Sequence, residues 1–287
     1  MHAAQTIQVP RLAGLSHQDF AKQYLRLLLP VILTDALTHW RALSKWTPEF
    51  FQREYGTVLI QVDGQQLSMA EFIDKVLASS LENPAPYLHN YLLEDHLPEL
   101  LADIDPLPRY TRPNWFESPL FPSRDTYTFI ELYIGGRGAQ FPQLHYDGWH
   151  SHAYLMQIQG IKEYVFYSPD QTLFLYPKPG RERNLSLIND LENPDFSRFP
   201  LFAQAQPIRC ELHPGEMLFV PAGWWHSARI LQTSITVSVN SVNAVNWRDF
   251  VRDYCETKAV SASRLRNLLI PPYLYMLGLL GPFLDML

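Results

Sequence analysis

In the first third of the chain, apolar residues recur at the three- and four-residue spacing of amphipathic helices. Three polar start signals precede such runs, each with the residue types of an N-cap or a capping box. They are Ser16 with Asp19, Thr47 followed by Pro48, and Ser68 with Glu71. Between these predicted helices, short runs of Val, Ile and Leu indicate strands at Val31–Leu33 and Val58–Val62.

From Tyr127 onward the pattern changes to short β-like runs separated by turn residues, such as His213-Pro214-Gly215-Glu216. The predicted strands are Tyr127–Ile134, Ala153–Ile158, Glu163–Tyr167, Ile208–Leu212, Met217–Val220, His226–Leu231 and Ile235–Asn240. This series favours an antiparallel sandwich or barrel. After Asn240 the helical spacing returns, with Trp247, Phe250, Val251 and Tyr254 on one face.

The resulting fold class is mainly β with helical additions. We expect three parts: a helix-rich segment over 1–125 that packs on the core, a β core over 126–241, and C-terminal helices over 242–287. The stretch from Pro84 to Pro122 is rich in proline and turn residues. We expect it to run over the surface or to line a pocket.

Composition describes an ordinary globular protein, because 47% of the 287 residues are hydrophobic and 18% are charged. The formal net charge of −6 gives no electrostatic footprint for DNA. It argues only mildly against RNA, since a local basic groove would suffice. The two cysteines, Cys210 and Cys255, are expected to be buried free thiols, which suits a reducing compartment. The N-terminus has no secretion-signal pattern, so we expect a cytoplasmic protein.

The run from Leu268 to Leu284 carries no charge and is dominated by apolar residues. Prolines and glycines interrupt it, and it is shorter than the roughly 20 residues that a spanning helix needs. We expect it to form apolar helices that pack on a second subunit. Packing on its own domain and membrane contact remain open as alternatives, with membrane contact the least favoured.

His145, Tyr146 and Asp147 form an H-x-D tripeptide, in which residues i and i+2 of an extended segment project to the same side. A second histidine from a distant strand would complete a two-His-one-carboxylate site with open positions for oxygen chemistry at iron. Zinc hydrolases use a similar set of ligands. The tripeptide alone is therefore weak support for a metal, and surface or core residues without a metal are its usual meaning.

Longer motifs make the interpretation specific. Leu144–Asp147 followed by Gln157–Pro169, then Asn193–Pro200, then Pro214–His226 resembles the signature segments of JmjC domains. The "PGE…WWH" run at 214–226 is the most distinctive. Upstream, residues 30–49 resemble the start of the small, cupin-like JmjC branch. That branch includes the asparaginyl hydroxylase that inhibits hypoxia-inducible factor and the tRNA wybutosine hydroxylase.

The resemblance implies a double-stranded β-helix, or jelly roll, that binds Fe(II), with 2-oxoglutarate as cosubstrate and O2 as oxidant. By position, His145, Asp147 and His226 match the iron ligands of the family. Lys162 matches the lysine that holds the distal carboxylate of 2-oxoglutarate. It also shares a strand face with Tyr164 and Phe166, where an ammonium needs an anionic partner. An exposed lysine at a barrel edge is the alternative.

Three further residues are candidates for binding the cosubstrate. Asn240 ends an alternating strand and matches an asparagine that faces the cosubstrate, although a plain strand end would look the same. Tyr87 resembles an upstream tyrosine that reaches the distal carboxylate. Tyr133 could serve instead, or it could belong to the core. Trp224 and Trp225 are expected to pack beneath the third ligand.

The sequence departs from the family pattern in two places. Pro142 stands where many relatives carry a serine or threonine that contacts 2-oxoglutarate. The segment after Asp147, from Gly148 to Tyr154, is two residues longer and lacks the usual asparagine. It contains His150 and His152, for which we keep three alternatives: metal binding, a place beside the site or facing substrate, and exposure to solvent.

The predicted activity is hydroxylation of a side chain in a protein or peptide substrate. A small metabolite or a tRNA nucleoside is the alternative substrate within the same class. N-methyl-lysine demethylation uses the same iron chemistry, but it usually accompanies reader domains, for which a chain of this length has no room. A non-catalytic cupin-like binding protein is the rival from a different class. The resemblance also implies a homodimer through the C-terminal helices.

Overall fold

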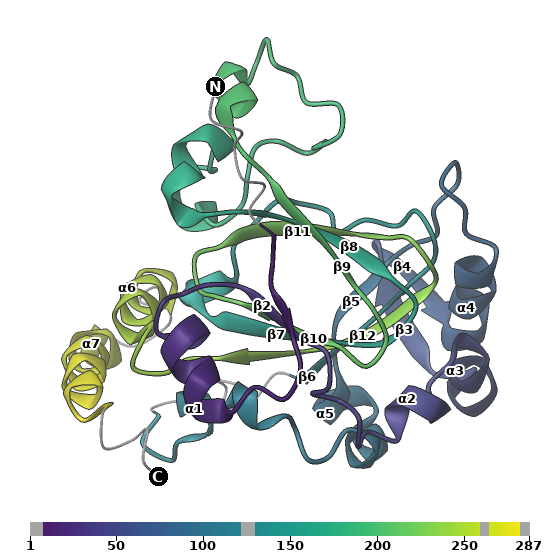
Figure 1. Ribbon diagram of the computed structural model, residues 1–287, viewed down its shortest axis with the longest axis horizontal. Coiled ribbons are helices and arrows are strands. Elements are labelled where there is room, and N and C mark those ends of the chain that lie inside the picture. Colours follow the sequence, from purple (N-terminus) through teal and green to yellow (C-terminus); the bar gives the residue numbers. More distant parts are fainter. Residues whose placement is uncertain (1–7, 122–129, 259–263, 282–287) are drawn as a thin grey trace.

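Two β-sheets face each other at the centre of the computed structural model, which describes residues 8–121, 130–258 and 264–281 (Figure 1). The strands are β1 (Arg11–Leu12), β2 (Val31–Leu33), β3 (Leu59–Val62), β4 (Gln65–Ser68), β5 (Leu88–Leu92), β6 (Ile130–Gly135), β7 (His152–Gln159), β8 (Lys162–Tyr167), β9 (Ile208–Leu212), β10 (Met217–Val220), β11 (Trp225–Ile230) and β12 (Ser234–Ser241). The α-helices are α1 (His17–Phe20), α2 (Ala42–Lys45), α3 (Pro48–Tyr55), α4 (Met69–Leu77), α5 (Leu93–His96), α6 (Trp247–Lys258) and α7 (Arg264–Leu279).

The larger sheet has the order β1-β2-β10-β7-β12-β6-β5, and the smaller one has the order β11-β8-β9. Within these two sheets the described pairs are antiparallel, apart from the parallel pair of β1 with β2. The strands β1, β2 and β5 come from the segment before residue 125. The first predicted segment therefore contributes strands to the large sheet as well as helices. The domain boundaries themselves stay predictions, and the one at 125 lies outside the described residues.

The alternation of side chains along the large sheet separates a core from a cavity. On β6, Leu132 and Ile134 are fully buried against the N-terminal helices, in a cluster that includes Phe51 and Phe72. The residues that alternate with them, Glu131 and Tyr133, face the space between the two sheets. Because successive side chains of a strand point to opposite faces, one face of this sheet builds the core and the other lines the site.

The predicted helix starts are confirmed by their hydrogen bonds. The Thr47 side chain accepts from the Phe50 amide at 3.1 Å with Pro48 in the first turn, and Ser68 and Glu71 form a reciprocal capping box. Helix α3 and helix α4 then place their apolar faces on the large sheet. The helix that starts at Ser16 differs from expectation, because α1 ends at Phe20 and a π-helix follows over 21–25.

The chain leaves helical geometry altogether just downstream. Pro30 disfavours helical backbone at the residue before it, and Leu28 already adopts a left-handed conformation with φ of 52°. The chain between Ser16 and Pro30 is therefore not one regular α-helix.

Eight of the nine predicted strands agree with the structure to within about one residue at each end, and for Tyr127–Ile134 the first three residues lie outside the described part. Strand β5 was not predicted, although it lies in the segment between Pro84 and Pro122. Its pairing with β6 contains an irregularity between Leu88 and Tyr91. A bulge of this kind removes the two-residue alternation by which strands are found in a sequence.

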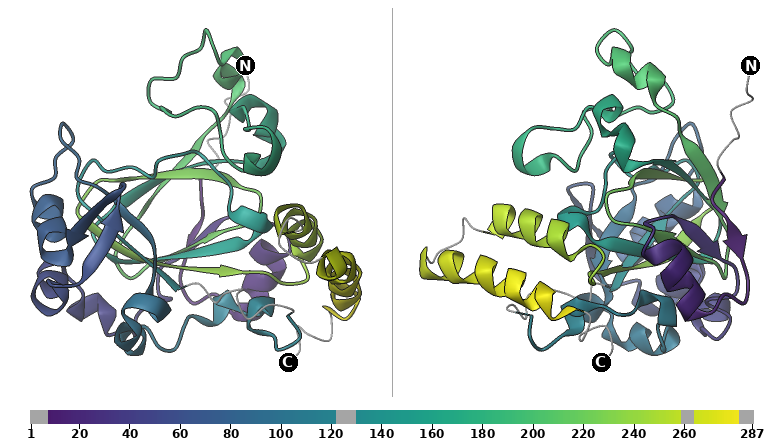
Figure 2. Two further views of the ribbon diagram at one scale, coloured as in Figure 1. Left: turned by 180° about the vertical axis from the view of Figure 1, so that it is seen from behind. Right: turned by 60° about the vertical axis from the view of Figure 1, so that its left-hand side comes forward.

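Helices α6 and α7 lie side by side at the opposite end of the molecule from α3 and α4 (Figures 1 and 2). Helix α7 continues through Pro271 and Pro272, so the prolines do not end it as the sequence suggested. Leu274 and Leu277 are buried against the Trp247 and Phe250 side of α6, and this packing holds the helix despite the lost amide donors. In the described part of the chain, no helix combines the length and apolar character needed to cross a membrane.

Candidate metal centre

His145 and His226 are directly opposite each other in an antiparallel bridge. The amide of His145 donates to the carbonyl of His226 at 3.0 Å, and the amide of His226 donates back at 2.6 Å. Residues that exchange both hydrogen bonds project their side chains to the same face of a sheet. The backbone therefore fixes both imidazoles side by side, with ring centroids 4.4 Å apart.

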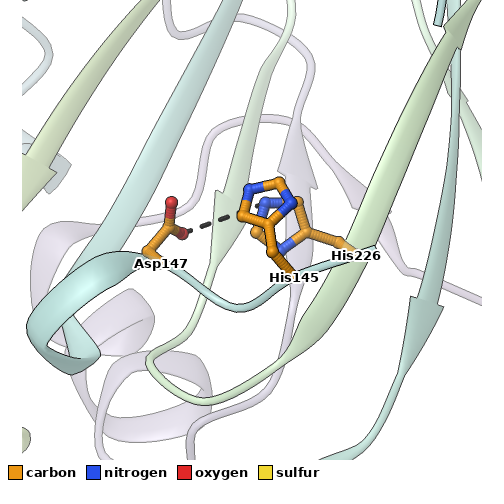
Figure 3. Close-up of side chains that lie close together, drawn as sticks. All are labelled: His145, Asp147 and His226. Carbon is orange, nitrogen blue, oxygen red and sulfur yellow. Dashed lines mark ion pairs between the residues drawn. The ribbon is translucent and has the colours of Figure 1, made fainter. Parts of the chain in front are cut away.

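Asp147 completes the group, because it follows His145 by two residues in the same extended segment. One ligand atom from each of the three side chains lies within 4.8 Å of the others, and His226 Nε2 is 3.9 Å from Asp147 Oδ2 (Figure 3). Among the described residues, this is the one group of three or more His, Cys, Asp or Glu side chains with such spacing. The three residues that the sequence predicted as ligands are thus brought together.

Hydrogen bonds orient both rings for metal binding. His145 Nδ1 lies 2.9 Å from the carbonyl of Gln143, and His226 Nδ1 lies 3.0 Å from the carbonyl of Trp224. Since a carbonyl only accepts, each Nδ1 carries the hydrogen and each Nε2 keeps a free lone pair. Metal-binding histidines are generally held by such a bond from the second nitrogen.

The electrostatics of the three residues fit a divalent cation. Burial lowers the pKa of both His145 and His226 to about 4, so both rings are neutral at pH 7. Burial also raises the pKa of Asp147 to about 6, and its Oδ2 is buried without a hydrogen-bond donor. Neutral imidazoles and an unpartnered carboxylate oxygen are the donor set that iron(II) or zinc(II) accepts.

A cavity of about 450 Å³ between the two sheets connects these ligands to Lys162 on β8. Lys162 is 1% exposed, and its ammonium lies 2.8 Å from the Tyr87 hydroxyl. No described carboxylate forms an ion pair with it. Burial lowers its pKa to about 7, as expected for an ammonium that lacks an anionic partner. The site fits an anionic ligand that enters the cavity and supplies that partner.

The two candidate tyrosines have different surroundings. Tyr87 contacts Lys162 directly, as its expected role requires. Tyr133 places its ring 5.3 Å from the Lys162 ammonium, but its hydroxyl lies 2.7 Å from Glu131 Oε2 and 2.9 Å from Asn90 Oδ1. Asn240 lines the same cavity, and its amide donates to Ser151 Oγ at 3.0 Å. The roles of these residues toward a cosubstrate stay predictions.

The longer segment after Asp147 is held by helix α6. Trp149 and His150 both adopt left-handed backbone conformations, with φ of 54° and 49°. Trp149 Nε1 donates to Thr257 Oγ1 at 2.8 Å, and His150 Nδ1 is 2.5 Å from Asp253 Oδ2. The longer segment thus forms a tight turn whose side chains are hydrogen-bonded to helix α6.

Neither extra histidine belongs to the metal group. His150 pairs with Asp253, whereas His152 is fully buried and accepts from the Ala222 amide at 3.0 Å. Solvent exposure is therefore wrong for His152. Pro142 lines the cavity and brings no hydroxyl there. Both tryptophans are buried, but in different places: Trp225 packs edge-on against Tyr146, between the first two candidate ligands, at 5.0 Å, whereas Trp224 belongs to a separate apolar cluster.

Several polar residues of the cavity were not singled out from the sequence: Glu131, Ser151, Thr236 and Ser238. Glu131 is the one that carries charge. Burial raises its pKa to about 7, the Tyr133 hydrogen bond opposes this rise, and the carboxylates of Asp147 and Glu94 add to it. A signal was present, since Glu131 alternates with buried Ile130 and Leu132 and so shares a face with Tyr133.

Comparison with known proteins agrees with this geometry. The cupin-like domain family matches residues 17–249, which include every strand from β2 to β12 and all three candidate ligands. The chain belongs to the cupin-like domain family. The expected class, a β-rich jelly roll with helical additions, is thereby confirmed.

Three relatives of this cupin-like chain carry named activities. Lysine-specific demethylase 8 of Xenopus tropicalis is 33% identical over 80% of this chain and 52% of its own length. Arginine-specific demethylase JMJ20 of Arabidopsis thaliana is 27% identical over 88% of this chain and 62% of its own length. The 2-oxoglutarate and iron-dependent oxygenase JMJD4 of Mus musculus is 29% identical over 84% of this chain and 61% of its own length. The chain therefore spans about half to three fifths of these relatives.

Proposed function

We propose that this cupin-like protein is an Fe(II)- and 2-oxoglutarate-dependent oxygenase that hydroxylates a side chain of a protein substrate. The observation that carries the proposal is the pairing, in one cavity, of the His145–Asp147–His226 group with the buried ammonium of Lys162. A zinc hydrolase needs only the first of these. A buried lysine beyond the metal ligands calls for a second, anionic ligand, as an oxygenase with a dicarboxylate cosubstrate requires.

The residues of this chain divide the work between them. His145, Asp147 and His226 would hold the metal on one face and leave its other positions open toward the cavity. Lys162, supported by the Tyr87 hydroxyl, would pair with the distal carboxylate of 2-oxoglutarate. Bound Fe(II) and 2-oxoglutarate together supply the oxidation of a C–H bond by O2, with succinate and CO2 as by-products. The protein contributes positioning and exclusion of water.

Aerobic incubation with Fe(II) and 2-oxoglutarate tests the class of reaction. The protein should form succinate slowly without a prime substrate, and Asp147→Ala should lower the rate at least about 100-fold, because a two-histidine site loses its anionic ligand. Asp249→Ala, an exposed change on α6, is the matched control and should keep the rate. Equal succinate formation by the parent and Asp147→Ala would contradict the proposal.

The same experiment separates the rival class. A binding protein with a degenerate site would bind metal and 2-oxoglutarate in a calorimeter and form no succinate above Asp147→Ala. Demethylation is the second candidate reaction, since two of the relatives described above are named demethylases. Mass spectrometry of a peptide product distinguishes the two outcomes, because hydroxylation adds an oxygen atom whereas demethylation removes a methyl group.

Two further proposals concern the setting of the enzyme. We propose that the chain pairs with a second copy through α7, which leaves Leu268, Tyr275 and Leu279 exposed. We also propose that it acts in the cytoplasm, and the free thiols of Cys210 and Cys255 support a reducing compartment. A protein substrate is preferred over DNA or RNA, in line with the net charge of −6.

A further inference from the structure

Glu131 is an acidic residue of the cavity that has no role in the proposed chemistry. It lines the cavity from β6 but does not belong to the metal group. The register of β6 with β12 places Glu131 opposite Ser238 and Tyr133 opposite Thr236. Along β12 these positions lead toward Asn240. Glu131 therefore lies one step nearer to the metal end of the cavity than Tyr133 does.

Neighbouring residues hold this carboxylate in a defined position. The Tyr133 hydroxyl lies 2.7 Å from Glu131 Oε2 and also 2.9 Å from Asn90 Oδ1. Asn90 reaches that hydroxyl because β5 bulges there, and its backbone has a left-handed φ of 55° that asparagine tolerates. Bulges beside a site commonly re-aim a side chain. The wall of Asn90, Tyr133 and Glu131 is thus a built feature at the solvent-facing side of the cavity.

What this wall lacks is a cation. Tyr133 is the hydrogen-bond donor to Glu131, and within residues 8–121, 130–258 and 264–281 no lysine, arginine or histidine forms an ion pair with its carboxylate. A half-buried carboxylate without a counter-ion is costly, and a cationic ligand would relieve that cost. The aromatic residues Phe116 and Trp149 also line the cavity, and aromatic rings suit the apolar stem of a charged side chain.

The cavity therefore offers charges of opposite sign at two places. Lys162 and Tyr87 form a cationic end that suits an anion, whereas Glu131 faces the space nearer to the metal ligands. One ligand of each sign can occupy the cavity together.

We propose that Glu131 is a specificity residue that pairs with the ammonium or guanidinium group of the substrate side chain. The inference rests on the proposed function, since it assigns the substrate class of that same site: a peptide segment presenting lysine or arginine.

Four peptide pools test this, each with one fixed central residue and with flanks randomised among residues other than lysine, arginine and histidine. Lysine is compared with norleucine, which lacks the amine, and arginine with citrulline, its neutral analogue. Succinate formation gives KM and kcat for each pool with the full chain, Fe(II) and 2-oxoglutarate. The KM for at least one cationic pool should be at least about tenfold below that of its neutral counterpart.

Glu131→Gln keeps the size of the side chain and the hydrogen bond with Tyr133 but removes the charge. It should raise the KM for the preferred cationic pool at least about tenfold, leave the KM of the neutral pool within about twofold, and change kcat less than KM. Glu94→Gln is the matched control. Glu94 lies behind the wall, accepting from the Ile130 amide at 3.4 Å, and it does not line the cavity, so the preference should persist.

The failures are distinguishable. If, without peptide, the parent forms succinate no faster than Asp147→Ala, the proposed function itself is wrong. Normal peptide-independent succinate formation would leave the function standing. The inference would then be overturned by equal KM values for charged and neutral pools, by no stimulation from either cationic pool, or by a preference that survives in Glu131→Gln.

Discussion

Lys162 occupies a position at which a buried strand would ordinarily carry an apolar side chain. It shares its face of β8 with Tyr164 and Phe166, which are 3% and 0% exposed, and is itself 1% exposed. An ammonium there is destabilising unless an anion accompanies it. The residue is therefore better explained by ligand binding than by folding. Removing its charge is expected to raise the stability of the fold and to lower the affinity for 2-oxoglutarate.

Lys162→Met should stabilise the ligand-free protein and weaken 2-oxoglutarate binding. Burial lowers the folded-state pKa of Lys162 to about 7, from an ordinary value of 10.5. The folded state therefore resists protonation. The destabilisation that the buried Lys162 ammonium causes is fully present below pH 7 and disappears as the pH rises toward 10.5. We expect the variant to gain about 2–3 kcal/mol at pH 7 and less at pH 9.5, measured by denaturant unfolding.

The same variant should raise the KM for 2-oxoglutarate at least about 30-fold, because a charge pair would be lost. Tyr87→Phe is the companion change, since it removes only the hydroxyl that touches Lys162 and should raise the KM a few-fold. A Lys162→Met protein that is less stable than the parent, with an unchanged KM, would mean that the lysine is structural.

At the scale of residues, the sequence predicted those site positions that strong motifs or alternation mark. His145, Asp147 and His226 became convincing through the long segments around them, and Lys162 through its place in an alternating strand. Tyr87 was found by resemblance alone. Asn90 and Ser151 depend on a bulge and on a turn, whose side-chain directions no spacing reveals. Glu131 could have been found, because the alternation of β6 places it beside Tyr133.

At the scale of elements, helix α6 holds the turn that follows the candidate metal ligand Asp147. Asp253 of α6 contacts His150 and forms an ion pair with Arg183, and Thr257 one turn later binds Trp149. Two successive left-handed residues are unfavourable for non-glycine side chains. The helix therefore stabilises a backbone conformation that the turn would not keep by itself.

Asp253→Ala should destabilise the fold by about 2 kcal/mol at pH 7. Burial alone would raise the pKa of Asp253, but hydrogen bonds from His150, Arg183 and Arg252 outweigh it and lower the pKa to about 2. The stabilisation is thus present above the ordinary aspartate value of 3.8 and is lost as the pH falls toward 2. Thermal unfolding of the parent and the variant at pH 7 and pH 3 should show the difference shrinking at the lower pH.

Asp249→Ala on the exposed side of the same helix is the control. Its ion pair with Arg252 is half exposed, so the variant should stay within about 0.5 kcal/mol of the parent. An Asp253→Ala protein as stable as Asp249→Ala at pH 7 would contradict the anchoring role.

The elements that the sequence predicted well are those whose signals are local. Capping residues placed α3 and α4, and alternation placed β7 to β12. Three differences have identifiable physical features: the bulge in β5, the π-helix and left-handed Leu28 that follow the first helix, and the tertiary packing that carries α7 through Pro271 and Pro272. Local patterns record side-chain preferences, whereas the packing of α7 depends on neighbours distant in the chain and the bulge in β5 on its pairing with β6.

At the scale of the whole molecule, α7 has two apolar sides. Leu274 and Leu277 pack on α6, whereas Leu268, Tyr275 and Leu279 are 71%, 52% and 80% exposed. These three positions are spaced by seven and four residues and form one stripe along the helix. An exposed apolar stripe of this length is typical of an interaction surface. A second copy of the chain is the partner that the family resemblance favours, through the same stripe on both subunits.

Deleting α7 would be an ambiguous test, because it would also uncover Trp247 and Phe250 in the core of the C-terminal region. The double change Leu268→Glu with Leu279→Glu alters only the exposed stripe. Light scattering should give a dimer mass for the parent and the mass of one chain, 33.3 kDa, for the variant. Leu173→Glu is the control, since Leu173 is 77% exposed on the connection between β8 and β9, and it should remain dimeric. A monomeric parent, or a double variant that keeps the dimer mass, would exclude this interface, because two buried glutamates per subunit would cost far more than the apolar stripe contributes.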